Sequence, residues 1–277
     1  MGKLRIQKYL AEAGVASRRA AEEMVTEGRV EVNGKILVDL PIFVAPDADE
    51  VIVDGKPVRP SDAKAGRMYF LLNKPRGVVC TQSDPQGRPR AVDLIPSLPS
   101  RVYCVGRLDL DSTGLIVLTN DGDLTEYLTH PRHQVTKTYV VEIPSRVEGD
   151  AINVIKKGIY LDGKKTQRSA VKVLKRDRNR TLMEIRLTEG RNREIRRMLA
   201  RVGYKVRRLH RKAIGPITDR GVKIGNYRPL RPAEVEALRS AGQDKPAKQR
   251  SAGPKGGPRK KKSSKPKKNP RQGGRHG

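Results

Sequence analysis

Four aspartates are concentrated in one short segment of the chain, GRLDLDSTGLIVLTNDGDL at residues 106–124. They are Asp109, Asp111, Asp121 and Asp123, and three glycines accompany them. The 277-residue chain as a whole is strongly basic, with a formal net charge of +29 at pH 7. Carboxylates in such a chain can ligate a metal ion, cap a helix, pair with arginines, or act as a nucleophile or base.

A calcium loop explains the segment poorly. Asp109, Asp111 and Gly114 match the first, third and sixth positions of an EF-hand loop, but the fifth position is Thr113 and the twelfth is Asn120. The apolar run LIVLT between them is typical of a buried strand. The chain also has only four histidines, no H-E-x-x-H motif and two cysteines without ligand spacing, so we expect no metal.

Two of the four acids have a structural explanation. Asp121 and Asp123 lie in TNDGD, which follows the apolar run and precedes LTEYL. This composition predicts a turn that leads into a capped helix. Asp109 and Asp111 remain, and either could form a structural ion pair with Arg107 or serve as a catalytic group.

A second segment, EGRNREIRRMLARVGYKVRRLHRK, supplies a partner for such a carboxylate. Ile195, Met198, Leu199 and Val202 form the apolar stripe of a helix that begins after a turn. Arg196 lies at the edge of this stripe, whereas Arg193 and Arg197 point away from it. Arg196 is therefore the arginine best placed to be partly buried and to need a carboxylate partner.

The same segment is dense in positive charge. From Arg186 to Lys212 there are 11 Lys+Arg against Glu189 and Glu194. Such a density predicts a phosphate-binding surface, and the alternative is a merely solvated basic helix.

The rest of the central region reads as short strands. MYFLLNKPRGVVCT predicts a strand, a tight turn at residues 74–77 and another strand. TYVVEI, GIYLDGKKT, SAVKVLK and TLMEIRL are further strands, with Asp162-Gly163 as a hairpin signal. Helical patterns are short and separated, so we expect an α+β fold with a mixed, mostly antiparallel sheet and flanking helices.

The first 62 residues read as a small α/β module. Apolar residues at helical spacing predict one helix that ends at Gly14 and a second, capped by Ser17, that ends at Gly28. VEVNGKI predicts a hairpin around Asn33-Gly34. Arg18 and Arg19 fall at the start of the second helix, where the helix dipole disfavours cations. They are either solvated or part of a phosphate-binding corner.

Charge divides the chain further. Residues 63–240 hold 37 Lys+Arg against 18 Asp+Glu, and residues 241–277 hold 13 against one. We therefore expect a folded domain over 63–240, a disordered basic tail over 241–277, and a polyanionic partner, with nucleic acid favoured over a membrane surface. No apolar run approaches the roughly 18 residues of a spanning helix, and no signal peptide is visible. Cys80 and Cys104, read as small buried residues, fit a reducing cytoplasm.

Two parts of the sequence resemble known protein families. RIQKYLAEAGVASRRAAEEMVTEGRVEVNGK resembles the small RNA-binding module of ribosomal protein S-four. NKPRGVVCT, GRLDLDSTGLIVLTNDGDL, HPRHQVTKTYVVEI and EGRNREIRRML then resemble, in order, the motifs of the rRNA pseudouridine synthases of the RsuA/RluB branch.

The resemblance implies roles for individual residues. It makes Asp109 the catalytic residue, Tyr139 the ring that packs on the target base, and Arg196 the partner of the catalytic carboxylate. We expect Arg196 to keep Asp109 ionised and to orient it. Tyr139 could instead be a core residue of its strand. RNA contacts are expected from Arg18, Arg19, Arg107, Lys137, Arg191, Arg193 and Arg197.

The implied reaction is the isomerisation of a uridine in ribosomal RNA to pseudouridine. It neither gains nor loses atoms, so no cofactor is required. The target nucleotide must be flipped out of its stack. We expect a cytoplasmic, monomeric enzyme whose substrate is 23S rather than 16S rRNA, or an assembly intermediate. The alternative is a noncatalytic rRNA-binding factor of ribosome assembly.

Overall fold

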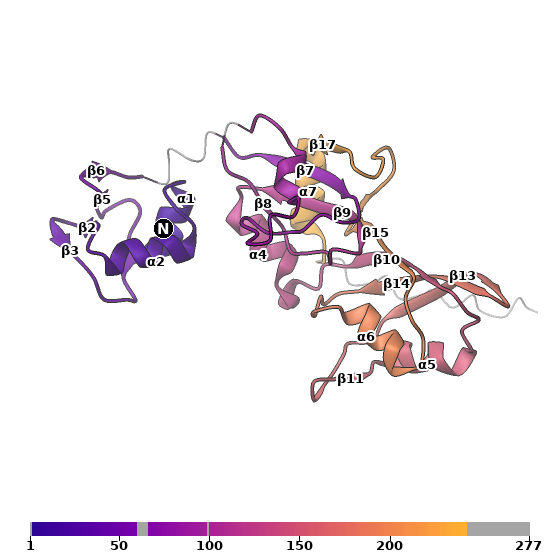
Figure 1. Ribbon diagram of the computed structural model, residues 1–277. Coiled ribbons are helices and arrows are strands. Elements are labelled where there is room, and N and C mark those ends of the chain that lie inside the picture. Colours follow the sequence, from indigo (N-terminus) through magenta and orange to yellow (C-terminus); the bar gives the residue numbers. More distant parts are fainter. Residues whose placement is uncertain (1, 60–65, 99, 243–277) are drawn as a thin grey trace, which may run out of the picture. The chain divides into compact units, whose positions relative to one another are not determined.

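The computed structural model describes residues 2–59, 66–98 and 100–242 (Figure 1). The small N-terminal part and the larger part from residue 66 onward are described separately. The predicted tail at 241–277 lies, apart from its first two residues, outside the described residues.

The N-terminal part contains the two predicted helices and the predicted hairpin. Helix α1 spans Ile6–Glu12 and α2 spans Arg18–Thr26, with the Ser17 hydroxyl accepting a hydrogen bond from the Ala20 N–H at 3.2 Å. Strands β2 (Val30–Val32) and β3 (Lys35–Ile36) flank Asn33 and Gly34, whose positive φ angles form the tight hairpin turn. The remaining strands of this part are β1 (Leu4–Arg5), β4 (Phe43–Val44), β5 (Val51–Val53) and β6 (Lys56–Pro57).

The larger part is built on one nine-stranded sheet. Its main path runs β13-β14-β10-β15-β9-β7-β17, with β16 beside β15 and β8 beside β9. These strands are β7 (Tyr69–Lys74), β8 (Tyr103–Cys104), β9 (Thr113–Thr119), β10 (Lys137–Ile143), β13 (Ala170–Asp177), β14 (Arg180–Leu187), β15 (Arg208–Ile214), β16 (Ile217–Thr218) and β17 (Tyr227–Pro229). All pairs are antiparallel except β9 with β15, so the predicted mixed, mostly antiparallel sheet is confirmed.

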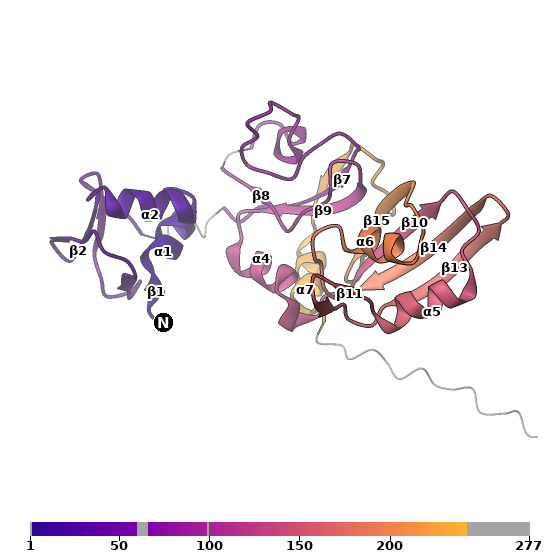
Figure 2. The ribbon, with the colours of Figure 1, turned by 60° about the horizontal axis from the view of Figure 1, so that its bottom comes forward.

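Helices pack on the two halves of this sheet. Helices α5 (Gly149–Lys157) and α6 (Glu194–Arg201) share a core with β10 and β14, while α4 (Gly122–Thr129) and α7 (Pro232–Ser240) share one with β7 and β9 (Figure 2). Three of the four residues of the stripe predicted for α6 are buried, Ile195, Met198 and Leu199, whereas Val202 follows the helix and is partly buried. Each such side chain contributes roughly 1.5–3 kcal/mol by leaving water.

Shorter elements complete the larger part. They are the hairpin β11 (Tyr160–Leu161) and β12 (Lys164–Lys165), and the 3-10 helices η1 (Ala91–Leu94) and η2 (Pro131–His133). The hairpin turns at Asp162 and Gly163, which both have positive φ, as their sequence predicts.

One predicted strand is wrong. After the turn at residues 74–77 the chain forms only a single bridge between Val79 and Arg90, not a strand beside β7. The two neighbours of β7 are β9 and β17, so its edges are already occupied. The Gly77 N–H instead donates to the Leu110 carbonyl at 2.9 Å, which ties this turn to the segment that carries Asp109.

The parallel pair β9–β15 determines where that segment lies. Gly114 at the start of β9 is the register partner of Arg211, and a Cβ at Gly114 would lie 2.4 Å from the Arg211 backbone. Only glycine permits this close approach, and its φ of +113° also disfavours other residues. Gly114 therefore allows the loop before β9 to lie directly against β15.

Among the helices of the described residues, none combines the length and the apolar composition that crossing a bilayer requires.

Candidate active site

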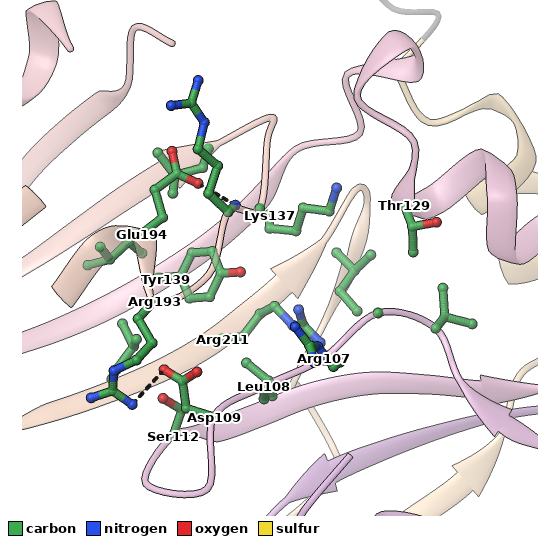
Figure 3. Close-up of a pocket in the computed structure, with 18 of the residues that line it drawn as sticks. Arg107, Leu108, Asp109, Ser112, Thr129, Lys137, Tyr139, Arg193, Glu194 and Arg211 are labelled. Atoms are coloured by element: carbon green, nitrogen blue, oxygen red, sulfur yellow. Dashed lines mark hydrogen bonds and ion pairs between the residues drawn. The ribbon is translucent and has the colours of Figure 1, made fainter. Parts of the chain in front are cut away.

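A pocket lies where the loop before β9, strands β10 and β15, and the loop into α6 meet (Figure 3). Asp109 and Ser112 come from the first loop, Tyr139 from β10, Arg211 from β15, and Arg193 from the loop into α6. Strand register explains the grouping, because Tyr139 pairs with Arg211, which in turn pairs with Gly114. Segments far apart in the sequence thus present their side chains to one cavity.

Asp109 is partly exposed in this pocket, with 24% of its side chain accessible. Its Oδ2 lies 3.5 Å from the Arg193 guanidinium and 3.7 Å from Arg196 Nε. Figure 3 shows the carboxylate and the Arg193 side chain meeting at one side of the pocket. The ion-pair partners of Asp109 in the described residues are thus these two arginines from the helix segment, and not its neighbour Arg107.

Arg196 is the more buried of the two arginines, with 11% of its side chain exposed against 46% for Arg193. It forms an ion pair with Asp111 at 3.0 Å and contacts the Ser112 hydroxyl at 3.4 Å and the Val206 carbonyl at 3.3 Å. Its Nε is buried and has no hydrogen-bond partner among the described residues, although it faces Asp109. Burial lowers the pKa of Arg196, and the nearby carboxylates oppose this effect.

Asp111 completes a four-membered network of two carboxylates and two guanidinium groups. It pairs with Arg193 at 3.4 Å as well as with Arg196. Unlike Asp109, it does not line the pocket. Asp109 is therefore the member of this network whose carboxylate is available to a molecule in the cavity.

Tyr139 lines the same pocket as Asp109. Lys137 and Tyr139 are two residues apart in β10 and point to the same face of the sheet, and both line the cavity. Burial and the positive charge of Arg211 lower the pKa of Lys137 to about 8. An aromatic ring, an amine and a carboxylate therefore surround one partly apolar space.

Arg211 is a pocket residue that sequence reasoning missed. It is 5% exposed, and its Nε donates to the Leu115 carbonyl at 2.6 Å. Its Nη2 is buried without a partner among the described residues. A signal existed in the sequence, because Arg211 alternates with the apolar Leu209 and Ala213 on the buried face of a strand.

Glu194 is the second acid that lines the pocket, and a backbone N–H holds its carboxyl group. It is 4% exposed, and its Oε2 accepts a hydrogen bond from the Arg191 N–H at 3.0 Å. Burial raises the pKa of Glu194 to about 8, and a hydrogen bond with Glu189 adds to the rise. Burial and the neighbouring Glu189 therefore favour the protonated form of Glu194, whereas Asp109 faces arginines.

We expect Glu194→Gln to make the free energy of unfolding less dependent on pH between about 4.5 and 8. In that window the folded protein retains a proton on Glu194 that the unfolded chain loses. The stability of the native protein should therefore fall as pH rises, by up to about 1.4 kcal/mol per pH unit. Arg191 and Arg193 also face this region in both proteins, and so does Lys137, whose pKa of about 8 means that it begins to lose its proton at the upper end of the window.

Urea unfolding at about pH 5 and about pH 8 measures this difference. Glu236→Gln is the matched control, because that side chain on α7 is 76% exposed. Equal pH profiles for the native protein and Glu194→Gln would show that Glu194 is ionised throughout.

Asp121 fulfils the predicted capping role and has further partners. Its Oδ1 accepts hydrogen bonds from the Asp123 and Leu124 N–H groups at the start of α4. Its Oδ2 accepts from the Tyr69 hydroxyl at 2.8 Å and pairs with Arg239. This carboxylate is buried and fully engaged, so it belongs to the frame of the domain and not to the pocket.

The predicted RNA contacts lie in different settings. Arg18 and Arg19 are exposed in the first turn of α2, and Arg107 is exposed at the pocket. Arg197 pairs with Asp162 of the β11–β12 turn. Arg191 binds Glu189 and the carbonyls of Lys164 and Lys165, so most of its donors are used inside the protein. The RNA-binding roles of all these residues stay predictions.

No cluster of three or more His, Cys, Asp or Glu side chains suited to a metal ion occurs in the described residues. Cys80 and Cys104 are half-buried, not fully buried as predicted. A hydrogen bond between the two thiols lowers the pKa of Cys80 to about 6.

Lys74 is fully buried, and its Nζ donates to the Pro75 and Val78 carbonyls at 2.9 and 2.8 Å, which fixes the turn after β7.

Comparison with known proteins adds to this geometry. Residues 68–201 match the RNA pseudouridylate synthase family, and residues 4–39 match the S4 domain. Ribosomal large subunit pseudouridine synthase B of Bacillus subtilis is 40% identical over 238 residues, which cover 85% of this chain and 96% of the relative.

A second relative and a solved structure are also similar. Ribosomal small subunit pseudouridine synthase A of Salmonella typhimurium is 35% identical over 240 residues, covering 85% of this chain and all of the relative. A crystal structure of a pseudouridylate synthase superposes with a TM-score of 0.61 at 31% identity, over 85% of this chain and 99% of that one.

Proposed function

Because the chain belongs to the RNA pseudouridylate synthase family and is thereby an RNA pseudouridine synthase, we propose that it modifies ribosomal RNA with Asp109 as the catalytic residue. Family membership confirms the fold and the activity implied by the four sequence motifs. It also decides against the noncatalytic assembly factor. The observation that carries the proposal for Asp109 is its position: it is the only acid of the arginine network that lines the pocket.

The reaction requires few functional groups from the protein. The bond between uracil N1 and ribose C1′ breaks, the base turns, and C5 bonds to C1′ while C5 loses a proton and N1 gains one. An ionised Asp109 can attack an electron-poor centre or remove a proton from the sugar, and can be released again. Arg193 and Arg196 stabilise the carboxylate charge and orient it. The reaction neither gains nor loses atoms or electrons, so it does not itself require a cofactor.

Our choice of substrate is based on the names of the two relatives and on the positive charge of this chain. The two relatives are named as large- and small-subunit ribosomal enzymes, and the large-subunit one is the more similar. The S4 domain and the basic surface fit an RNA substrate. We propose 23S rRNA, free or in an assembly intermediate, as the substrate of a cytoplasmic monomer with parts at 1–62, 63–240 and 241–277.

Tritium release tests this proposal. Large- and small-subunit rRNA transcripts labelled at C5 of uridine are incubated with the protein, and the released label is counted. We expect release from the large-subunit transcript or its assembly intermediate. Release from small-subunit rRNA alone would overturn the choice of substrate, and release from neither would overturn the ribosomal assignment.

We expect Tyr139→Ala to lower kcat/KM by about 5- to 150-fold, because a base that stacks on an aromatic ring gains roughly 1–3 kcal/mol. Stacking offsets part of the cost of flipping the uridine out of its strand. Tyr139→Phe retains the ring and should stay within a few-fold of native activity. If both variants lose activity equally, the hydroxyl and not the ring is what the pocket uses.

A further inference from the structure

The eleven basic residues between Arg186 and Lys212 do not form one surface. Side chains alternate along β14 and β15, so Ile185, Leu187, Leu209 and Arg211 face the pocket side of the sheet. Arg186, Arg208 and Lys212 face the opposite side. The charge that the sequence places in one segment is thus divided between the two faces of the sheet.

We call the opposite side of strands β13, β14, β10 and β15 the back face. Helices α5 and α6 pack on the pocket side of these strands (Figure 1). On the back face, Val140 and Leu182 are only partly buried in the middle of the sheet. The cations of this face are all exposed; they are Lys172, Lys175, Arg180, Arg186, Arg207, Arg208 and Lys212.

Two carboxylates, Glu142 and Glu184, lie close to five of these seven cations. Glu142 is 10% exposed and lies 3.5 Å from Arg180, 3.7 Å from Arg207 and 3.8 Å from Arg208. None of these three distances is that of a hydrogen bond, so the guanidinium groups keep donors free for another acceptor.

The second carboxylate, Glu184, is 12% exposed and pairs with Arg186 at 2.8 Å and with Lys212 at 3.9 Å. Five cations therefore surround two largely buried acids and leave a net charge of +3. The arginine and lysine ends point outward, since they are 46–75% exposed. Like charges gathered in this way are stabilised by an anion that binds over them.

We propose that the back face binds the phosphates of a second, double-stranded segment of the RNA, on the side of the sheet opposite the pocket. The proposal rests on the proposed function only in taking the partner to be RNA. Four adjacent strands span about 14 Å, enough to meet several phosphates of one helix. The residues of these four strands that face this side include no Phe, Tyr or Trp, and the ring of His210 is engaged by Thr113 and Asp219, so the face lacks a free platform for stacking single-stranded bases.

The test compares two variants of the full chain. The back-face variant combines Lys172→Gln, Lys175→Gln and Lys212→Gln. It leaves every arginine–carboxylate pair in place and removes only two lysine contacts, Lys212 with Glu184 at 3.9 Å and Lys175 with Asp177 at 3.4 Å. The control combines Lys156→Gln, Lys157→Gln and Lys223→Gln, which removes the same charge from exposed positions on α5 and after β16. The probe is an RNA duplex of about 20 base pairs, with Kd measured against salt concentration.

We expect the back-face variant to bind the duplex about 10-fold more weakly than the control, with the slope of log K against log salt reduced by about 2. Its single-turnover rate on an rRNA transcript at saturating enzyme should stay native, which separates this surface from the catalytic pocket. Equal slopes for the two variants would overturn the proposal. Equal loss of binding to polyglutamate and to the duplex would also overturn it, in favour of an acidic protein partner.

Discussion

Asp109→Asn is expected to reduce pseudouridine formation by at least about 10⁴-fold, as loss of a central catalytic group does in other enzymes. The asparagine amide has nearly the shape of the carboxylate but can act neither as a nucleophile nor as a base. Asp109 and Glu194 are the two acids that line the pocket within the described residues. Glu194 is 4% exposed, its Oε2 is engaged by the Arg191 N–H, and burial favours its protonated form, so it is not placed to replace Asp109.

Single-turnover tritium release at saturating enzyme measures this loss, and a binding titration measures the affinity for the same RNA. The affinity should change by no more than about 3-fold, because one side chain is altered on a large basic surface. Asp111→Asn is the matched control, since Asp111 pairs with the same two arginines but does not line the pocket. If Asp111→Asn were as inactive as Asp109→Asn, the network as a whole, and not Asp109, would be essential.

Arg196→Met is expected to lower the single-turnover rate constant by about 10²- to 10³-fold, the loss that removal of one preorganised donor produces. The buried Nε lacks a hydrogen-bond partner and faces Asp109 at 3.7 Å, a distance that a small movement on substrate binding would close. Methionine keeps much of the side-chain volume but leaves Asp109 and Asp111 with Arg193 alone. Arg196 acts as a positioning residue in this account, because it acts through the carboxylate.

A structural role would also affect activity, so rescue and stability are measured with it. Arg196→Lys retains the charge and should recover about 10-fold of the lost rate, without the fixed geometry of the guanidinium. Arg201→Met, an exposed change on the same helix, should leave the rate and Tm unaltered. A rate for Arg196→Met within 10-fold of native would contradict the positioning role.

Local sequence signals predicted most elements correctly because each depends on residues close in the chain. Ser17 caps α2, Asn33-Gly34 and Asp162-Gly163 form hairpin turns, and Asp121 caps α4. The predicted strand after residues 74–77 was wrong because its environment is not local. A strand needs a free neighbouring edge, and β9 and β17 already occupy both edges of β7.

The residues of the candidate site were likewise predicted only in part from the sequence. The motifs pointed to Asp109, Tyr139 and Arg196, and helical periodicity placed Arg196 at a buried edge. They did not show that Arg193 and Asp111 join Asp109 and Arg196 in one network, or that Arg211 lies beneath the pocket. Those contacts link residues that are about 80 to 100 positions apart in the chain.

The sequence by itself determined the family, the chemistry and the periodic elements, because motif identity, turn residues and apolar spacing are local properties of the chain. Only the tertiary structure decided which carboxylate faces the cavity and which side of the sheet each arginine occupies. The physical reason is the parallel pairing of β9 with β15 at Gly114, which brings the Asp109 loop next to Arg211 and, across it, Tyr139. Strand register then divides the basic segment between the pocket and the back face.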